Sequence, residues 1–187
     1  GAAVQWLRDG LGLISKSSEV EILAESVEDS GDVEFVPALA GLGAPYWDPH
    51  ARGTITGLTR GSTKAHIARA TLEAMALQNC EILWSMEKDS KKKLKTLKVD
   101  GGAAANDLLM QIQSDYLRTQ VVRPQVVETT AMGAAFLAGL GVGVWKDTGD
   151  IKKIWKKDKD FTSTMKPPAR KTRLARWQKA VKAARVQ

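Results

Sequence analysis

The chain has 187 residues, 43% of them hydrophobic and 26% charged, with a formal net charge of +7. This length and composition are typical of a globular protein with a buried core and exclude a disordered one. A single cysteine excludes an internal disulfide, and no apolar run approaches the roughly 20 residues of a membrane-spanning helix. We therefore expect a cytoplasmic protein with no membrane span. The first residue is Gly1 rather than a methionine, which suggests a fragment of a longer protein.

The positive charge is confined to two segments. Residues 88–98 hold six lysines and one aspartate, and residues 146–187 hold 14 basic and 4 acidic residues. The rest of the chain holds 8 basic and 16 acidic residues and is therefore acidic. A nucleic-acid interface needs cations on one face, preferably beside aromatic rings, and the last segment offers Trp155, Phe161 and Trp177. We favour the simpler interpretation, a solvated helix face with a loop, because runs of charge are usually exposed to water.

Two helices are predicted at the start of the chain. Residues 4–14 have apolar side chains at helical spacing and predict an amphipathic helix, with Val4, Leu7, Leu11 and Ile14 on its apolar face. Ser18 followed by Glu21 is typical of a capping box, which would open a second helix ending near Val27.

A strand and a shaped loop are predicted next. Residues 33–36 favour a strand that Pro37 ends. Residues 37–61 are rich in glycine and aromatic residues, which excludes a long helix and leaves room for a short strand over residues 54–58.

Residues 63–89 predict a long helix. Its apolar residues lie on two faces, one with Ile67, Ala70, Ala74 and Leu77 and the other with Leu72, Met75, Ile82 and Met86. A helix that is apolar on two faces packs between layers, so we expect it to be central.

Strands and helices alternate in the second half of the chain. Small residues dominate 130–140, which favours a helix packed very close to a neighbour. The last helix, over residues 170–184, should direct Leu174, Trp177 and Val181 inward and its cations outward. The other predicted elements are strands at residues 94–99 and 121–123 and a helix at residues 104–117. This alternation predicts an α/β fold.

The strand that ends at Val99 leads directly into Asp100, Gly101 and Gly102. Glycines at such a turn let a ligand approach the backbone, and the helix behind them offers unpaired N–H groups that favour phosphate or another electron-rich group. Asn106, in the first helical turn, could reach a base or ribose edge with its amide. An ordinary strand-to-helix turn is the alternative interpretation.

The remaining candidate residues are weaker. Asp48, His50 and Arg52 could do acid–base chemistry, but Asp-Pro-His in a loop is more typical of a turn with surface polar groups. His66 favours a packing or surface role, and Cys80 that of a small hydrophobic residue. Two histidines and one cysteine do not provide metal-ligand spacing, and the commonest hydrolase and nucleoside-triphosphatase motifs do not occur.

Several segments together resemble the glycerol kinases, members of the carbohydrate kinase family that also phosphorylates xylulose and gluconate. The similarity runs from Gly1 to about Asp150 and continues faintly to the Trp177 helix. The segments are GAAVQWLRD (1–9), SVE (26–28), FVP (35–37), GLGAPYWDPHARGTITGLTR (41–60), VDGG (99–102) and VVETTAMGA (126–134).

This resemblance implies a two-domain kinase of the actin-like, ribonuclease-H-like fold, with a central sheet flanked by helices and ATP in the cleft between domains. The chain would form the C-terminal nucleotide-binding domain, with residues 1–150 as its core and 151–187 as a basic segment ending in a helix. The N-terminal substrate domain would be absent.

By the family pattern, four residues bind ATP. Gly1, Gln5 and Gly102 approach the nucleotide, and Asn106 meets its adenine side. The family usually has Asn-Asn where this chain has Asn106 and Asp107. The catalytic aspartate and the glycerol-binding residues precede Gly1, so no catalytic, substrate-binding or metal-ligating residue is assigned within this chain.

The resemblance further implies that the intact parent phosphorylates glycerol to sn-glycerol 3-phosphate, using ATP with Mg²⁺, and forms a homo-oligomer that binds no nucleic acid. Glycerol would bind through the missing domain, and this chain alone would be inactive. One alternative is a kinase of the same family for another polyol or sugar. A second is a stand-alone nucleotide- or nucleic-acid-binding module, which only the basic tail supports.

Overall fold

The computed structural model describes residues 1–185, which form seven α-helices, one 3₁₀-helix and five strands. The helices are α1 (Ala2–Asp9), α2 (Glu19–Glu25), α3 (Lys64–Ser90), η1 (Gly102–Ala105, 3₁₀), α4 (Asp107–Leu117), α5 (Thr129–Gly141), α6 (Thr148–Ile154) and α7 (Pro167–Arg185). The strands are β1 (Glu34–Val36), β2 (Thr54–Thr56), β3 (Thr96–Lys98), β4 (Gln120–Pro124) and β5 (Lys157–Phe161).

Two separate sheets are present in the described residues. β1 and β2 pair antiparallel, with Phe35 opposite Ile55. β3 and β4 pair in parallel, and β5 joins the other edge of β4 antiparallel. The four predicted strands are therefore confirmed. β5 was not predicted because its sequence alternates lysine and aspartate, which are uncommon in strands.

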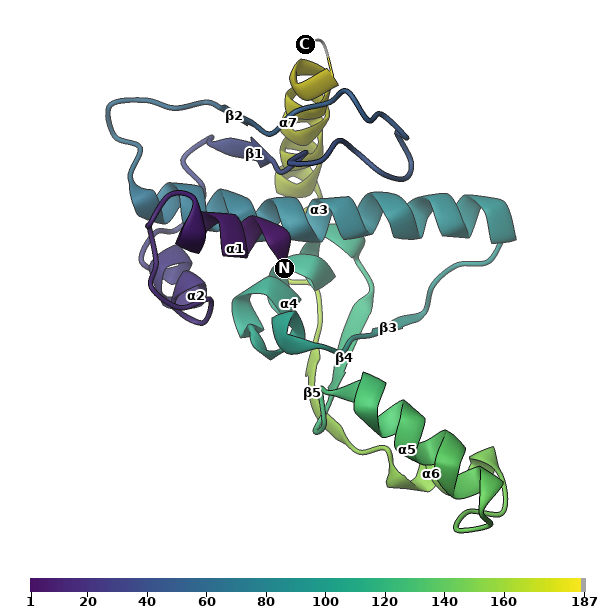
Figure 1. Cartoon of the computed structure of the whole chain (residues 1–187). Helices are drawn as coiled ribbons and strands as arrows, with labels where there is room; N and C mark the ends of the chain where they lie inside the picture. Colours follow the sequence, from purple (N-terminus) through teal and green to yellow (C-terminus); the bar gives the residue numbers. More distant parts are fainter. Residues whose placement is uncertain (186–187) are drawn as a thin grey trace.

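Helix α3 lies at the centre of the molecule, as its two apolar faces predict. It contacts α1, α2 and α4 on one side and β1 and α7 on the other (Figure 1). The prediction fails for the last turns, where Ile82 is 40% and Met86 59% exposed. These turns extend beyond the body, so neither residue has a layer to pack against (Figure 1).

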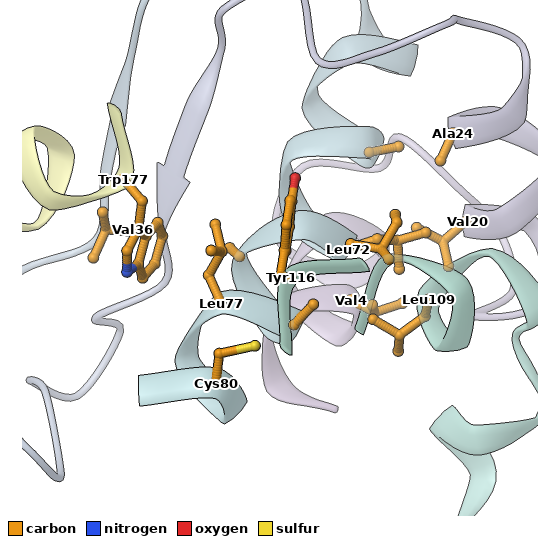
Figure 2. Packing of buried hydrophobic residues seen from close by; sticks show 14 of the residues in the cluster. Val4, Val20, Ala24, Val36, Leu72, Leu77, Cys80, Leu109, Tyr116 and Trp177 are labelled. Carbon is orange, nitrogen blue, oxygen red and sulfur yellow. The ribbon is translucent and has the colours of Figure 1, made fainter. Parts of the chain in front are cut away.

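The core gathers around α3. Figure 2 shows Tyr116 of α4 standing between Leu77 and Leu72 of α3, with Trp177 of α7 on one side and Val20 of α2 on the other. All five side chains are at most 3% exposed. At roughly 25 cal/mol per Å² of buried apolar surface, this cluster is a main source of stability.

Helix α7 does not direct all its cations outward, contrary to the prediction. Arg173 is only 6% exposed and forms ion pairs with the buried Glu34 of β1 and Glu73 of α3. Its Nε donates to Glu73 at 2.7 Å and to the Tyr116 hydroxyl at 3.1 Å. Burial lowers the pKa of Arg173 to about 10, which still leaves the guanidinium charged at neutral pH. The inward positions of Trp177 and Val181 are confirmed.

Other arginines of the basic C-terminal segment, residues 146–187, also pair with acidic residues of the rest of the chain, which is called the body below. Arg176 contacts Asp32 and Glu34, and Arg185 contacts Asp48 at 3.0 Å. The prediction of a simple solvated face is therefore corrected. Much of the arginine charge of this segment pairs with acidic residues of the surface on which α7 packs.

Helix α1 is shorter than predicted, because the chain turns at Gly12. This glycine has a φ of +61°, and its N–H donates to the Arg8 carbonyl while the Leu13 N–H donates to the Leu7 carbonyl, so the chain turns back over the end of the helix. Ile14 is consequently buried although it lies beyond the helix, and Leu11 is exposed.

The capping box predicted for Ser18 and Glu21 is wrong. The Ser18 side chain makes no capping hydrogen bond, and Glu21 instead accepts from the Leu108 N–H at 2.9 Å. A capping box occurs at the start of α3, where Thr63 pairs with His66. His66 therefore has a capping role.

Helix α5 does not pack closely against the rest of the molecule, contrary to the prediction from its small residues. It projects from the rest of the molecule together with α6 (Figure 1). Gly139 is the one buried residue of α5. Trp145 folds back over Gly139, where a Cβ would collide with the ring.

None of the helices within residues 1–185 is long and apolar enough to cross a membrane.

The buried ion pairs of Arg173 generate the first prediction. Replacing Arg173 with alanine removes the cation that bridges two buried carboxylates and leaves Glu34 paired only with Arg176 and Glu73 only with Arg69. We therefore expect the free energy of unfolding to fall by about 3 kcal/mol, at the lower end for a broken buried pair. Urea unfolding measures this change. Lys182→Ala, on the exposed face of the same helix, is the control and should alter stability by less than about 0.5 kcal/mol. Equal effects of the two substitutions would contradict the structural role of Arg173.

Candidate nucleotide site

The glycine turn after β3 has the geometry of a ligand-facing loop. Gly101 has a φ of +77°, which favours glycine, and its N–H donates to the Val127 carbonyl at 2.7 Å. Gly102 is exposed, and a Cβ added to it would meet no atom within 4 Å. Its backbone N–H and that of Ala103 begin η1 and therefore have no intrahelical acceptor. The turn thus leaves space for a ligand beside backbone donors that have no intrahelical acceptor.

A cavity of about 300 Å³ lies beside this turn. Gly1, Gly102 and Asn106 line it together, although Gly1 precedes α1, Gly102 begins η1 and Asn106 follows η1. Its apolar lining comes from α1, α2, α3 and α4, through Val4, Val20, Leu72, Met75 and Leu109. Three of the four residues predicted to bind ATP are therefore brought to one place.

The fourth residue, Gln5, does not line this cavity. It lies one turn along α1, where its N–H donates to the Gly1 carbonyl at 3.0 Å, and its side chain is exposed.

Asn106 caps α4 instead of lying in its first turn, which corrects the prediction. Its Oδ1 accepts from the Leu109 N–H at 2.6 Å, so this oxygen is committed to the helix. Nδ2 makes no hydrogen bond within the described residues and remains available as a donor to a ligand.

The start of α4 is not the phosphate site that its dipole suggests. The Glu21 carboxylate lies there, on the cavity wall, and accepts from the Leu108 N–H. Its negative charge opposes a phosphate at the same point. Sequence reasoning missed this role of Glu21, because the only signal was a pattern that fitted a local cap.

Asp107 replaces the second asparagine of the family pattern. It pairs with Lys159 at 2.6 Å and Arg123 at 2.7 Å, and these two cations lower the pKa of its carboxyl. The negative charge of Asp107 is therefore neutralised by cations of β4 and β5.

Asp48, His50 and Arg52 form a turn remote from the cavity lining, as the simpler interpretation predicted. Asp48 Oδ1 accepts from the backbone N–H groups of His50 and Ala51, and Oδ2 pairs with Arg185. Hydrogen bonding to Arg185 lowers the pKa of Asp48, so this group is a poor proton carrier at neutral pH.

Within residues 1–185, the structure shows no group of three histidine, cysteine, aspartate or glutamate side chains arranged to hold a metal ion. Cys80 is fully buried and its Sγ accepts from Gln113 at 3.2 Å, which agrees with the role predicted for it.

Comparison with known proteins shows which family and which proteins the chain resembles. Residues 1–142 match the family described as the FGGY family of carbohydrate kinases, C-terminal domain. The chain is 68% identical to the glycerol kinase of Bdellovibrio bacteriovorus over 97% of its own length, and 58% identical to that of Deinococcus radiodurans over 99%. It spans 37% of the length of each.

Solved structures agree with these relatives. The glycerol kinase of Plasmodium falciparum with ADP matches the whole chain with a TM-score of 0.89 at 38% identity, over 37% of its own length. The xylulose kinase of Lactobacillus acidophilus matches 98% of the chain with a TM-score of 0.74, over 36% of its own length. At 24% identity, this second likeness shows the fold alone.

The position of Glu21 generates a second prediction. Glu21→Ala removes the acceptor of the Leu108 N–H, so we expect the free energy of unfolding to fall by about 1 kcal/mol. Thermal or urea unfolding measures the loss. Glu25→Ala, on the exposed end of the same helix, should have little effect. A similar loss in both variants would show that helix charge, rather than the bond to α4, is responsible.

The burial of Cys80 generates a third prediction. Burial raises the pKa of this thiol to about 12, so it remains protonated and inaccessible at pH 8. We expect no reaction of the native protein with Ellman's reagent and one thiol per chain after unfolding in urea. Rapid reaction without denaturant would contradict the burial.

Proposed function

Because the chain belongs to the FGGY family of carbohydrate kinases and has its actin-like, ribonuclease-H-like ATPase fold, we propose that it forms one wall of an ATP site. The observation that carries this proposal is the cavity shared by Gly1, Gly102 and Asn106. The glycerol kinase of Plasmodium falciparum was solved with ADP, which supports a nucleotide as the ligand.

The chemistry of the cavity supports one orientation of the nucleotide. Its apolar lining suits the nucleoside, and Asn106 Nδ2 can donate to an acceptor on the adenine ring. The phosphates fit beside Gly102, where backbone N–H groups are free and no side chain intrudes, and away from the Glu21 carboxylate. Gln5 would contact the nucleotide at the exposed end of the site.

For the longer protein, we propose transfer of the terminal phosphoryl group of ATP to glycerol, giving sn-glycerol 3-phosphate. Relatives named glycerol kinase, at 56–68% identity, favour glycerol over another polyol or sugar. Phosphoryl transfer depends on positioning and on charge stabilisation. This chain's residues bind and orient the nucleotide. The base that accepts the glycerol proton would lie outside them.

Mg²⁺ would accompany ATP and neutralise the charge on its phosphates. Because residues 1–185 offer no ligand cluster for a metal, we assign the ion to the phosphates and to groups elsewhere in the longer protein. Because the proposed base lies outside this chain, the chain alone should give no turnover in a coupled assay of glycerol phosphorylation, and measurable turnover would overturn that placement of the base. We further propose a cytoplasmic homo-oligomer in which residues 1–187 form the nucleotide-binding domain.

A nucleic-acid-binding module is disfavoured by the ion pairs of the tail. Arg173, Arg176 and Arg185 are engaged with acidic residues of the body and are not gathered on a free face. Binding of DNA or RNA with a steep dependence on salt would contradict this view.

Asn106 allows a fourth prediction that separates ligand binding from stability. Asn106→Asp keeps an oxygen for the Leu109 N–H but replaces the Nδ2 donor. We expect similar thermal stability and an affinity for MgATP about fivefold lower, because a hydrogen bond is worth about 1 kcal/mol. Calorimetric titration measures the affinity. Unchanged affinity would remove Asn106 from the site, and no binding by the unsubstituted chain would contradict the proposed site.

A further inference from the structure

We propose that Arg123 is a positioning residue that fixes the nucleotide-facing turn, an inference that rests on the proposed function. Arg123 lies in β4, its side chain is 12% exposed, and it does not line the cavity. It acts on the ligand only through the backbone that it holds.

The guanidinium of Arg123 is bonded to the C-terminal end of η1. Its Nη1 donates to the carbonyls of Ala104 at 2.9 Å and Ala105 at 3.2 Å and pairs with Asp107 at 2.7 Å. The last carbonyls of a short helix have no intrahelical partner, so a side-chain donor is needed to satisfy them. Arg123 donates to η1 through Nη1 and at the same time to Asp158 through Nε, and the single nitrogen of a lysine cannot occupy both positions.

The N-terminal end of the same turn is held by the segment that follows Arg123. The Gly101 N–H donates to the Val127 carbonyl, and the Thr129 hydroxyl donates to Asp100. Residues 123–129 therefore fix the turn at both ends. Gly102 and Ala103 lie between these ends, so the clamp fixes the N–H groups that the proposed phosphates would use.

Such a clamp lowers the cost of binding. A turn that is already ordered loses little conformational entropy when a ligand arrives, whereas a loose turn must be ordered by the ligand itself. Asp107 strengthens the clamp, because Lys159 and Arg123 keep its carboxyl ionised and charge-assisted bonds are the stronger ones.

Three variants test the proposal. Arg123→Met removes every bond to η1, and Arg123→Lys keeps the charge without the planar donor set. Asp158→Asn is the matched control, because Asp158 pairs with Arg123 through Nε at 2.8 Å and its substitution leaves the Nη1 donors to η1 in place. Hydrogen exchange at the amides of Ala104, Asn106 and Leu109 and calorimetric affinity for MgATP are measured on each variant, beside thermal unfolding.

We expect both Arg123 variants to exchange these amides faster and to bind MgATP about tenfold more weakly, while Asp158→Asn behaves as the unsubstituted chain. Arg123→Lys decides the outcome if Arg123→Met does not fold. Unchanged exchange at the turn would overturn the clamp whether or not nucleotide binds. Faster exchange with unchanged affinity would overturn its role in binding. No binding by the unsubstituted chain would instead reject the proposed ATP site, and hydrogen exchange would still decide whether Arg123 holds the turn.

Discussion

The ion pairs of buried Arg173 with Glu34 and Glu73 constrain the whole arrangement of helices. A guanidinium and two carboxylates removed from water cost several kcal/mol unless they meet one another, so α7 must lie against β1 and α3 at this point. Helix α3, held from this side, then supports the cavity from the other through Leu72 and Met75. Together with the pairs of Arg176 and Arg185, this pairing makes part of the basic C-terminal segment complementary to the acidic rest of the chain.

The proposed site is built on backbone rather than on reactive side chains. Gly102 offers N–H groups and space, and Asn106 both caps α4 and retains a free donor. Glu21 closes the helix end that would otherwise compete for phosphate. These groups can hold and orient a nucleotide but carry no acid–base chemistry. That division of labour fits phosphoryl transfer, in which positioning and electrostatics contribute most of the catalysis.

Local patterns predicted the fold well, and long-range partners explain the failures. The strand followed by Gly101 and Gly102 is a local signal, and the structure places this turn at the cavity. Glu21 matched a capping box three residues after a serine, but its partner Leu108 lies 87 positions away. Arg173 was predicted to be exposed, because helical periodicity carries no information about distant partners. The carboxylates of Glu34 and Glu73 are brought to this place by β1 and α3. The cavity itself combines four helices, which no single stretch of sequence encodes.

The most direct test of the proposed nucleotide site is an NMR titration of the ¹⁵N-labelled chain with ADP. We expect the largest amide shift changes at Gly102, Ala103 and Asn106, followed by residues of the cavity lining such as Val20 and Leu109. Changes confined to the lysine-rich residues 88–98, or no changes at all, would contradict the site.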